Sequence, residues 1–159
     1  MKAVMISFKH CPMKNFPDLP PVWTISAIGL IYLLNWAVPY FLFDFPNTWV
    51  GYSFLAIGIC LIFWSAFWFF RKKTTIEPHH SATTLLVEGP YKISRNPIYL
   101  GLVIICLGCV FNVGNPLGFF PLIGLIWALH TRFVIPEEKG LLKTFGKEAE
   151  AYIAATRRW

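Results

Sequence analysis

The chain has 159 residues and a formal net charge of +6; 56% of the residues are hydrophobic and 14% are charged. An average soluble domain is about 45–50% apolar and about 25% charged, so this composition excludes a disordered protein and indicates an integral membrane protein. Four cysteines are too few and too scattered for a disulfide scaffold. The length fits one domain, which we take as residues 1–159.

The first two predicted elements are apolar helices over residues 22–43 and 49–70, neither of which contains a charged residue. At about 1.5 Å per residue each helix is about 33 Å long, enough to cross a hydrocarbon core of about 30 Å. Residues 44–48 between them carry the Pro and Asn signals of a tight turn. The two helices are therefore expected to form an antiparallel transmembrane hairpin.

A second hairpin is predicted from helices over residues 98–113 and 117–135, joined by a Gly-Asn-Pro turn at 114–116. The first arm would be about 24 Å long, slightly short of a full crossing. The second arm is apolar apart from three polar residues near its end, 130–132. The expected fold is an all-α integral membrane protein with four transmembrane helices in two hairpins.

All 14 Lys and Arg residues lie before the first span, between spans two and three, or from Arg132 onward. Under the positive-inside rule this places both termini and the central loop in the cytoplasm, with only the two short turns outside. Membrane orientation thus accounts for the net charge, and no basic stripe remains for nucleic acid. The short, prokaryotic-looking chain is expected in a bacterial or archaeal cell membrane.

Two cytoplasmic segments complete the predicted organisation. Residues 71–95 form a connection that is too polar for lipid and too long for a simple link, which favours a functional loop. From Glu137 to Trp159 the apolar residues recur at helical spacing, so we expect a helix on the membrane surface or against the bundle, with a bend at Gly146.

The adjacent acids Glu137 and Glu138 follow Pro136 at the predicted end of the fourth span. They could simply complement the positive end of a helix dipole. Alternatively, two carboxylates at a membrane boundary are tolerated because they face a cationic ligand, or Arg95 or Arg132.

Arg95, Asn96 and Pro97 open the third span, where Asn and Pro are strong helix-start signals. Helix initiation does not explain Arg95 or the flanking Tyr91 and Tyr99, although each tyrosine could be an interfacial anchor. His130 is a secondary candidate, since an ionisable group within a span is expected to face protein or water.

Other patterns carry little chemistry. Cys106 and Cys109 have the spacing of a metal or redox pair but lie within an apolar helix, and His79 and His80 lack a third ligand. We therefore predict no metal site. The chain also lacks a glycine-rich phosphate loop and a Ser/His/Asp set, so any chemistry is expected at the cytoplasmic face.

Residues 83–91 (Thr-Thr-Leu-Leu-Val-Glu-Gly-Pro-Tyr) and 94–101 (Ser-Arg-Asn-Pro-Ile-Tyr-Leu-Gly) resemble the signature of the isoprenylcysteine carboxyl methyltransferase family. The similarity resumes at Glu137-Glu138 and continues through Phe145-Gly146, Tyr152 and Arg158-Trp159, so that it covers residues 83–159. The related phospholipid methyltransferases share much of this pattern.

The resemblance implies an S-adenosylmethionine-dependent membrane methyltransferase acting on a lipophilic acceptor: an isoprenylcysteine-like carboxylate, a small lipid, a thiol or an isoprenoid acid. It implies catalytic roles for Arg95 and for Arg132, which would face the acceptor. The implied cofactor-binding residues are Thr83, Thr84, Leu85, Leu86, Tyr91, Asn96, Pro97, Ile98, Tyr99, Glu137 and Glu138.

Within that site the resemblance places Glu138, with Glu137 beside it, against the cationic part of the donor. Two positions depart from the family pattern. Asn96 stands where the family commonly has His, and Asn can form hydrogen bonds but cannot titrate. This replacement puts any acid–base role at position 96 in doubt. Thr83 stands where eukaryotic members tend to have His.

Two other functions fit the same topology. A membrane oxidoreductase of the steroid-reductase type would bind NADPH, but it would need more basic groups than Lys92 and Arg95 for the additional phosphates. A non-catalytic four-span protein would use the boundary motifs only to start helices. Binding of S-adenosylhomocysteine, of NADPH or of neither separates the three functions.

Overall fold

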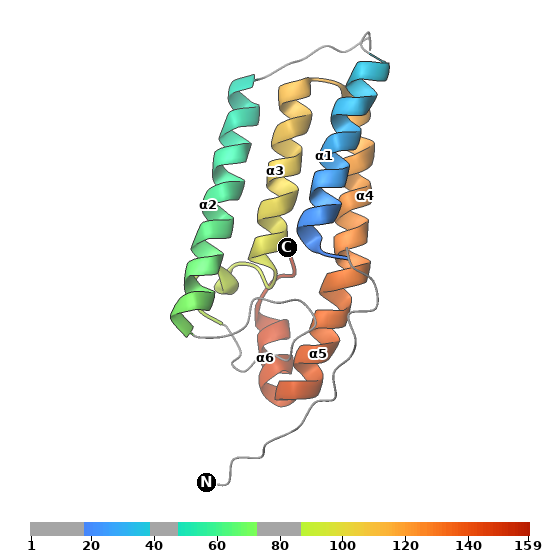
Figure 1. The fold of residues 1–159 in the computed structure, drawn as a ribbon. Helices are drawn as coiled ribbons and strands as arrows, with labels where there is room; N and C mark the ends of the chain where they lie inside the picture. The colour runs from blue at the N-terminus through green and yellow to red at the C-terminus, as the bar shows by residue number, and fades with distance from the viewer. Residues whose placement is uncertain (1–17, 39–47, 73–86) are drawn as a thin grey trace.

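The computed structural model describes residues 18–38, 48–72 and 87–159, and within these ranges the chain is helical, without a β-strand (Figure 1). The longer helices are α1 (Pro20–Ala37), α2 (Thr48–Lys72), α3 (Pro97–Val113), α4 (Phe119–Leu129), α5 (Ile135–Phe145) and α6 (Lys147–Ala155). Three short turns of helix join them: η1 (Gly89–Lys92), η2 (Pro116–Gly118) and η3 (His130–Val134). The all-α expectation is confirmed for the described residues.

Helices α1 to α4 lie side by side as a bundle, while α5 and α6 extend from one end of it (Figure 1). Two stretches, Thr48–Trp68 and Pro116–Phe145, are long and apolar enough to cross a membrane, and Pro97–Val113 is a shorter apolar helix. The first predicted span, residues 22–43, was placed too far toward the C-terminus, because α1 begins at Pro20 and ends at Ala37, with Val38 already outside the helical conformation. Residues 39–47, which include most of the predicted turn, lie outside the described residues. Four spans in two hairpins therefore remain a prediction.

The third helix has the expected bounds for clear local reasons. Pro97 occupies its first turn, and Gly114 ends it with a left-handed φ of 72°, a conformation that glycine adopts without steric cost. Asn115 then accepts a hydrogen bond from the Leu117 amide at 3.0 Å, which fixes the predicted turn into the next helix.

The fourth helix continues beyond residue 135, because α4, η3 and α5 form one helical stretch from Pro116 to Phe145. Pro136 has no N–H to donate to the carbonyl of Arg132. In the preceding turn the chain widens into a π-helix, and the Ile135 amide donates to the carbonyl of His130. Gly146, with a φ of 52°, separates α5 from α6 at the predicted bend.

Backbone contact between two pairs of glycines joins α2 and α3. A Cβ added to Gly58 would lie 2.7 Å from the carbonyl oxygen of Gly101, and one added to Gly51 would lie 2.9 Å from that of Gly108. Any larger residue at these positions would push the helices apart. Close approach at small residues is a usual way for apolar helices to associate in lipid.

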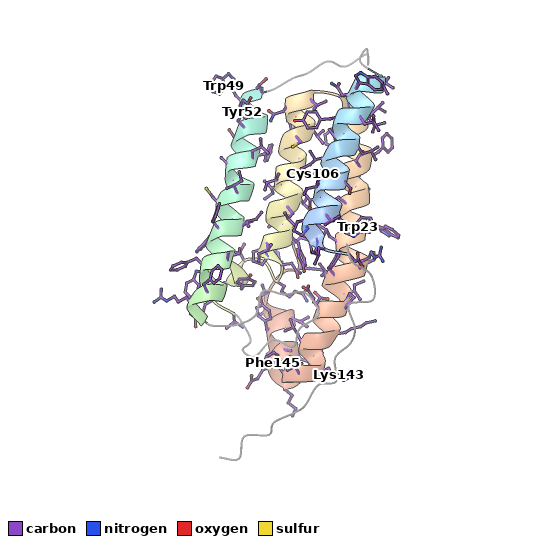
Figure 2. All side chains as sticks on the ribbon, in the orientation of Figure 1. Trp23, Trp49, Tyr52, Cys106, Lys143 and Phe145 are labelled. Atoms are coloured by element: carbon purple, nitrogen blue, oxygen red, sulfur yellow. The ribbon has the colours of Figure 1, made fainter. Side chains whose placement is uncertain are left out.

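The hydrophobic core lies among α1, α3 and α4, where Ile31, Cys106, Leu129 and Phe133 have no exposed surface or almost none. Figure 2 labels Cys106 within the bundle and Trp49 on the outside, at one end of α2. Trp49 is 84% exposed and Trp36 is 79% exposed. Exposed aromatic surface of this extent favours contact with lipid over contact with water.

Candidate active site

The site begins where the segment after α6 meets the residues before α3. The amide of Arg95 donates to the carbonyl of Arg157 at 2.8 Å. The Ser94 hydroxyl donates to the carbonyl of Arg158 at 3.1 Å, and the Asn96 side-chain amide donates to the same oxygen at 3.2 Å. Asn96 stands at the N-cap of α3, but its side chain makes no capping bond. It connects two segments distant in sequence instead.

Glu138 lies between two arginines at this junction. Its Oε1 is 2.8 Å from Nη1 of Arg95, while Arg158 donates from Nε and Nη2 to its two carboxylate oxygens at 2.9 and 2.7 Å. The side chains of Glu138 and Arg95 are 12% and 11% exposed. Two guanidinium groups therefore compensate the charge of this carboxylate, and its hydrogen bonds raise the pKa of Arg158.

Glu137 has a different environment. Its Oε1 accepts a hydrogen bond from the Tyr99 hydroxyl, and among residues 18–38, 48–72 and 87–159 no basic side chain forms an ion pair with it. About 20 residues from Pro116 already cover a 30 Å core, so Glu137 lies just beyond the predicted span. Burial raises the pKa of this carboxyl from 4.5 to about 7, against the lowering effect of the Tyr99 hydrogen bond. The site thus favours an added positive charge.

Two tyrosines lie near Glu137 and are themselves packed against other residues. The Tyr99 ring packs against Phe133 with ring centroids 6.2 Å apart. Tyr91 is buried, and its carbonyl accepts a 2.9 Å hydrogen bond from the Tyr152 hydroxyl. Burial raises the pKa of Tyr91, and the nearby Tyr152 and Glu137 add to this effect. Tyr99 and Tyr91 therefore lie near the Glu137 carboxyl, and Tyr152 of α6 holds the backbone of Tyr91.

A close contact with α2 positions η1. Gly89 has a φ of 61°, and a Cβ added there would lie 2.3 Å from Nε1 of Trp68. The Arg71 guanidinium lies over the Trp68 ring, with its Cζ 5.6 Å from the ring centroid. Glycine at position 89 is required both for the backbone conformation and for the contact, which together fix the place of Tyr91 two residues later.

Arg132 faces the start of α1 rather than the paired acids. Its Nη2 lies 3.3 Å from Asp18 Oδ2, and its Cζ is 5.2 Å from the centroid of the Trp23 ring. Trp23 in turn donates from Nε1 to Asp18 at 2.8 Å. With 47% of its side chain exposed, Arg132 lies at the edge of the bundle, where Figure 2 labels Trp23.

His130, one π-helical turn before α5, has its Nδ1 buried without a hydrogen-bond partner in the part of the chain that the structure describes. Its ring centroid is 6.5 Å from that of Trp159. Trp159 also packs against the hydrophobic core.

Comparison with known sequences assigns the chain to a family. A sequence profile of the phospholipid methyltransferases matches residues 46–148, about two thirds of the chain. The chain belongs to the phospholipid methyltransferase family. The family resemblance seen in the sequence motifs is thereby confirmed.

Two rice proteins, from Oryza sativa subsp. indica and subsp. japonica, are each named a probable protein-S-isoprenylcysteine O-methyltransferase. Both are 25% identical to this chain over 137 residues, which make up 86% of the chain and 61% of each relative. The chain therefore spans about three fifths of the length of these relatives. No solved structure matches the chain.

The structure brings together several residues that the family resemblance singled out: Tyr91, Arg95, Asn96, Tyr99, Glu137 and Glu138 all lie at the junction of η1, α3, α5 and the segment after α6. Pro97 is buried and Ile98 half-buried in the first turn of α3. Thr83, Thr84, Leu85 and Leu86 lie outside the described residues.

Sequence reasoning had missed one site residue. Arg158 is the second partner of Glu138. Its position in the Arg158-Trp159 part of the family resemblance is the sequence feature that could have identified it.

Proposed function

We propose that this phospholipid methyltransferase family member is an integral membrane enzyme that transfers a methyl group from S-adenosylmethionine to the head of a lipophilic acceptor. In this proposal four helices cross the membrane, both termini are cytoplasmic, and the site lies at the inner boundary of the bilayer. The family assignment supports methyl transfer, and the names of the rice relatives support an isoprenylcysteine-like carboxylate among the candidate acceptors.

The buried carboxyl of Glu137 carries the proposal. It is held by Tyr99 and has no cationic partner among the described residues, whereas its neighbour Glu138 has two. A sulfonium would supply the missing positive charge, and aromatic faces such as those of Tyr91 and Tyr99 also favour cations. The residues present therefore fit the cationic part of S-adenosylmethionine.

Other residues complete the proposed cofactor site. Residues 83–86 and the first turn of α3, from Asn96 to Ile98, would line the rest of the donor, as the family resemblance implies. Glu138 would act less by touching the sulfonium than by holding Arg95 and Arg158 in place, because both arginines bind its carboxylate directly.

The two arginines assigned to catalysis have separate tasks in this proposal. Arg95 has a buried Nε without a hydrogen-bond partner in the described ranges, and this N–H would bind an oxygen of the reacting head. Arg132, half exposed beside α1, would meet the acceptor as it approaches from the bilayer.

Methyl transfer requires little from the chain beyond the alignment of the methyl donor with the acceptor. When bound, S-adenosylmethionine supplies an electrophilic methyl carbon, whose bond to sulfur breaks as a bond to the acceptor forms. An acceptor carboxylate needs no general base, so the protein's residues orient the two reactants and exclude water. This agrees with a site built from tyrosines and compensated charges.

Calorimetry on the protein in detergent tests the proposal by comparing S-adenosylmethionine with S-adenosylhomocysteine, which lacks the sulfonium charge. The wild type is expected to bind both and to prefer the cationic compound. Glu137→Gln should weaken S-adenosylmethionine binding more than tenfold, about 1.4 kcal/mol, and leave S-adenosylhomocysteine within about threefold. Glu148→Gln, at an exposed acid on α6, is the matched control.

Tyr99→Ala and Glu138→Gln should each weaken the binding of both compounds more than tenfold, since each disturbs the site itself. Wild-type protein that binds neither compound would overturn the proposal. NADPH binding would then indicate a reductase, and no binding at all a non-catalytic protein.

A further inference from the structure

His130 carries a buried polar atom that the proposed function does not use. Its Nδ1 is shielded from solvent and has no hydrogen-bond partner within the described residues. The large majority of buried side-chain nitrogens and oxygens in native proteins have a partner. An exception beside a candidate site suggests that the partner is a ligand.

The place of His130 limits what that ligand can be. The preceding residue, Leu129, is fully buried in the apolar core, and so is Phe133, whose ring contacts Tyr99. Tyr99 in turn holds Glu137. His130 therefore lies at the boundary between the apolar interior of the bundle and the proposed methyl-donor site. A lipophilic acceptor must place its polar head at that boundary while its chain stays in an apolar environment.

The local backbone favours a fixed imidazole. His130 opens the π-helical turn, and its carbonyl accepts the hydrogen bond from the Ile135 amide. Its ring lies beside Trp159, 6.5 Å between centroids, and Trp159 packs against the core. Widened turns of this kind occur often at functional sites. Trp159 thus contacts one side of the His130 ring, and Nδ1 remains available to bind a ligand.

We infer that His130 positions the acceptor by donating a hydrogen bond from Nδ1 to an anionic oxygen of its head. This inference rests on the proposed function. A carboxylate of an isoprenylcysteine and a phosphate of a phospholipid share this chemistry, because both present an oxyanion on a lipophilic molecule. His130 is a positioning residue here, and neither proton transfer nor covalent chemistry is assigned to it.

Two substitutions separate this role from simple packing. His130→Phe keeps an aromatic ring beside Trp159 and removes both nitrogens. His130→Asn keeps a hydrogen-bonding group near the position of Nδ1 in a smaller side chain. If the ring only packs, Phe should be tolerated better than Asn; if Nδ1 binds the acceptor, the order is reversed.

The experiment measures probe binding to detergent-solubilised protein saturated with S-adenosylhomocysteine. One probe is N-acetyl-S-farnesylcysteine, compared with its methyl ester, which lacks the anionic oxygen. The other is a short-chain phosphatidylethanolamine. The wild type should bind at least one of these two probes, each of which carries an anionic oxygen, and the identity of that probe distinguishes a carboxylate from a phosphate.

For the probe that binds, His130→Phe should weaken affinity more than tenfold and His130→Asn should restore it to within about threefold. Affinity for S-adenosylhomocysteine should stay within about twofold in both variants. The methyl ester should bind the wild type and His130→Phe equally weakly.

Equal affinity of the wild type and His130→Phe for the probe that binds would overturn the inference, as would a wild type that binds S-adenosylhomocysteine but neither of the probes with an anionic oxygen. If His130→Phe does not fold, equal binding of the carboxylate probe and its ester by the wild type would overturn the carboxylate assignment. Failure of the wild type to bind S-adenosylhomocysteine would instead count against the proposed function.

Discussion

The contrast between Glu137 and Glu138 leads to opposite expectations for the same substitution at adjacent positions. Burial raises the pKa of Glu137 from 4.5 to about 7, so the folded protein holds this proton at pH values where the unfolded chain has lost it. Ionisation of Glu137 therefore costs stability as the pH rises above 4.5, and the full cost is reached above pH 7. The difference between the two pKa values corresponds to about 3 kcal/mol.

Glu137→Gln removes this cost and keeps an oxygen that can accept the Tyr99 hydrogen bond. We expect the variant to match the wild type near pH 4 and to be more stable by up to about 3 kcal/mol at pH 8. For a chain of this length that is a rise in Tm of roughly 6–12 °C. Tryptophan fluorescence during thermal unfolding in detergent, without cofactor, measures the difference at each pH.

Glu138→Gln should act in the opposite direction at pH 8. It leaves the 11% exposed Arg95 without its carboxylate, and removing one partner of a buried ion pair costs about 3–5 kcal/mol. Because Arg158 is more exposed, we expect the lower end of that range. A Glu137→Gln variant with the same Tm offset from the wild type at pH 4 and pH 8, or one less stable at pH 8, would refute this account of Glu137.

Three further predictions concern affinity and packing. Between pH 6 and 8 the affinity for S-adenosylmethionine should rise relative to that for S-adenosylhomocysteine as Glu137 ionises, and calorimetry on Glu137→Gln should show no such trend. Gly58→Ala places a Cβ 2.7 Å from the Gly101 carbonyl and should cost about 1–3 kcal/mol in thermal unfolding, whereas Gly124→Ala, with nothing within 4 Å, should cost nothing. Tyr152→Phe leaves the buried Tyr91 carbonyl without its donor and should cost about 1–3 kcal/mol, and an unchanged Tm would contradict the role of that bond.

Local signals in the sequence account for much of the fold. The lengths of the charge-free stretches predicted the bounds of α2 and α3 to within about two residues. Gly114 and Gly146 lie at the ends of helices, as expected of a residue that adopts a positive φ easily. The π-helical turn escaped prediction, because Pro136 can either start a helix or interrupt one, and only packing decides between them. The glycine contacts of α2 with α3 also depend on how two helices align, which apolar periodicity does not encode.

The candidate site was predictable in its residue types but not in its pairings. Tyr99 and Glu137 are separated by 38 positions and Asn96 and Arg158 by 62, so their contacts arise only from the tertiary fold. The sequence left open whether the adjacent acids face a ligand or an arginine. In the folded chain Glu138 binds two arginines, while Glu137 has no cation among the described residues. One residue of spacing on a helix separates a stabilising ion pair from a candidate ligand contact.

The glycine contacts between α2 and α3 also fix how far one helix is shifted along the other. Gly51 meets Gly108 and Gly58 meets Gly101, so both contacts form in only one axial alignment. A slip of one helical turn, about 5.4 Å, would break both. Such a slip would also carry Tyr99 away from Tyr91, which Trp68 of α2 anchors through Gly89. Four residues without side chains thus set the depth at which the aromatic rings of the site meet.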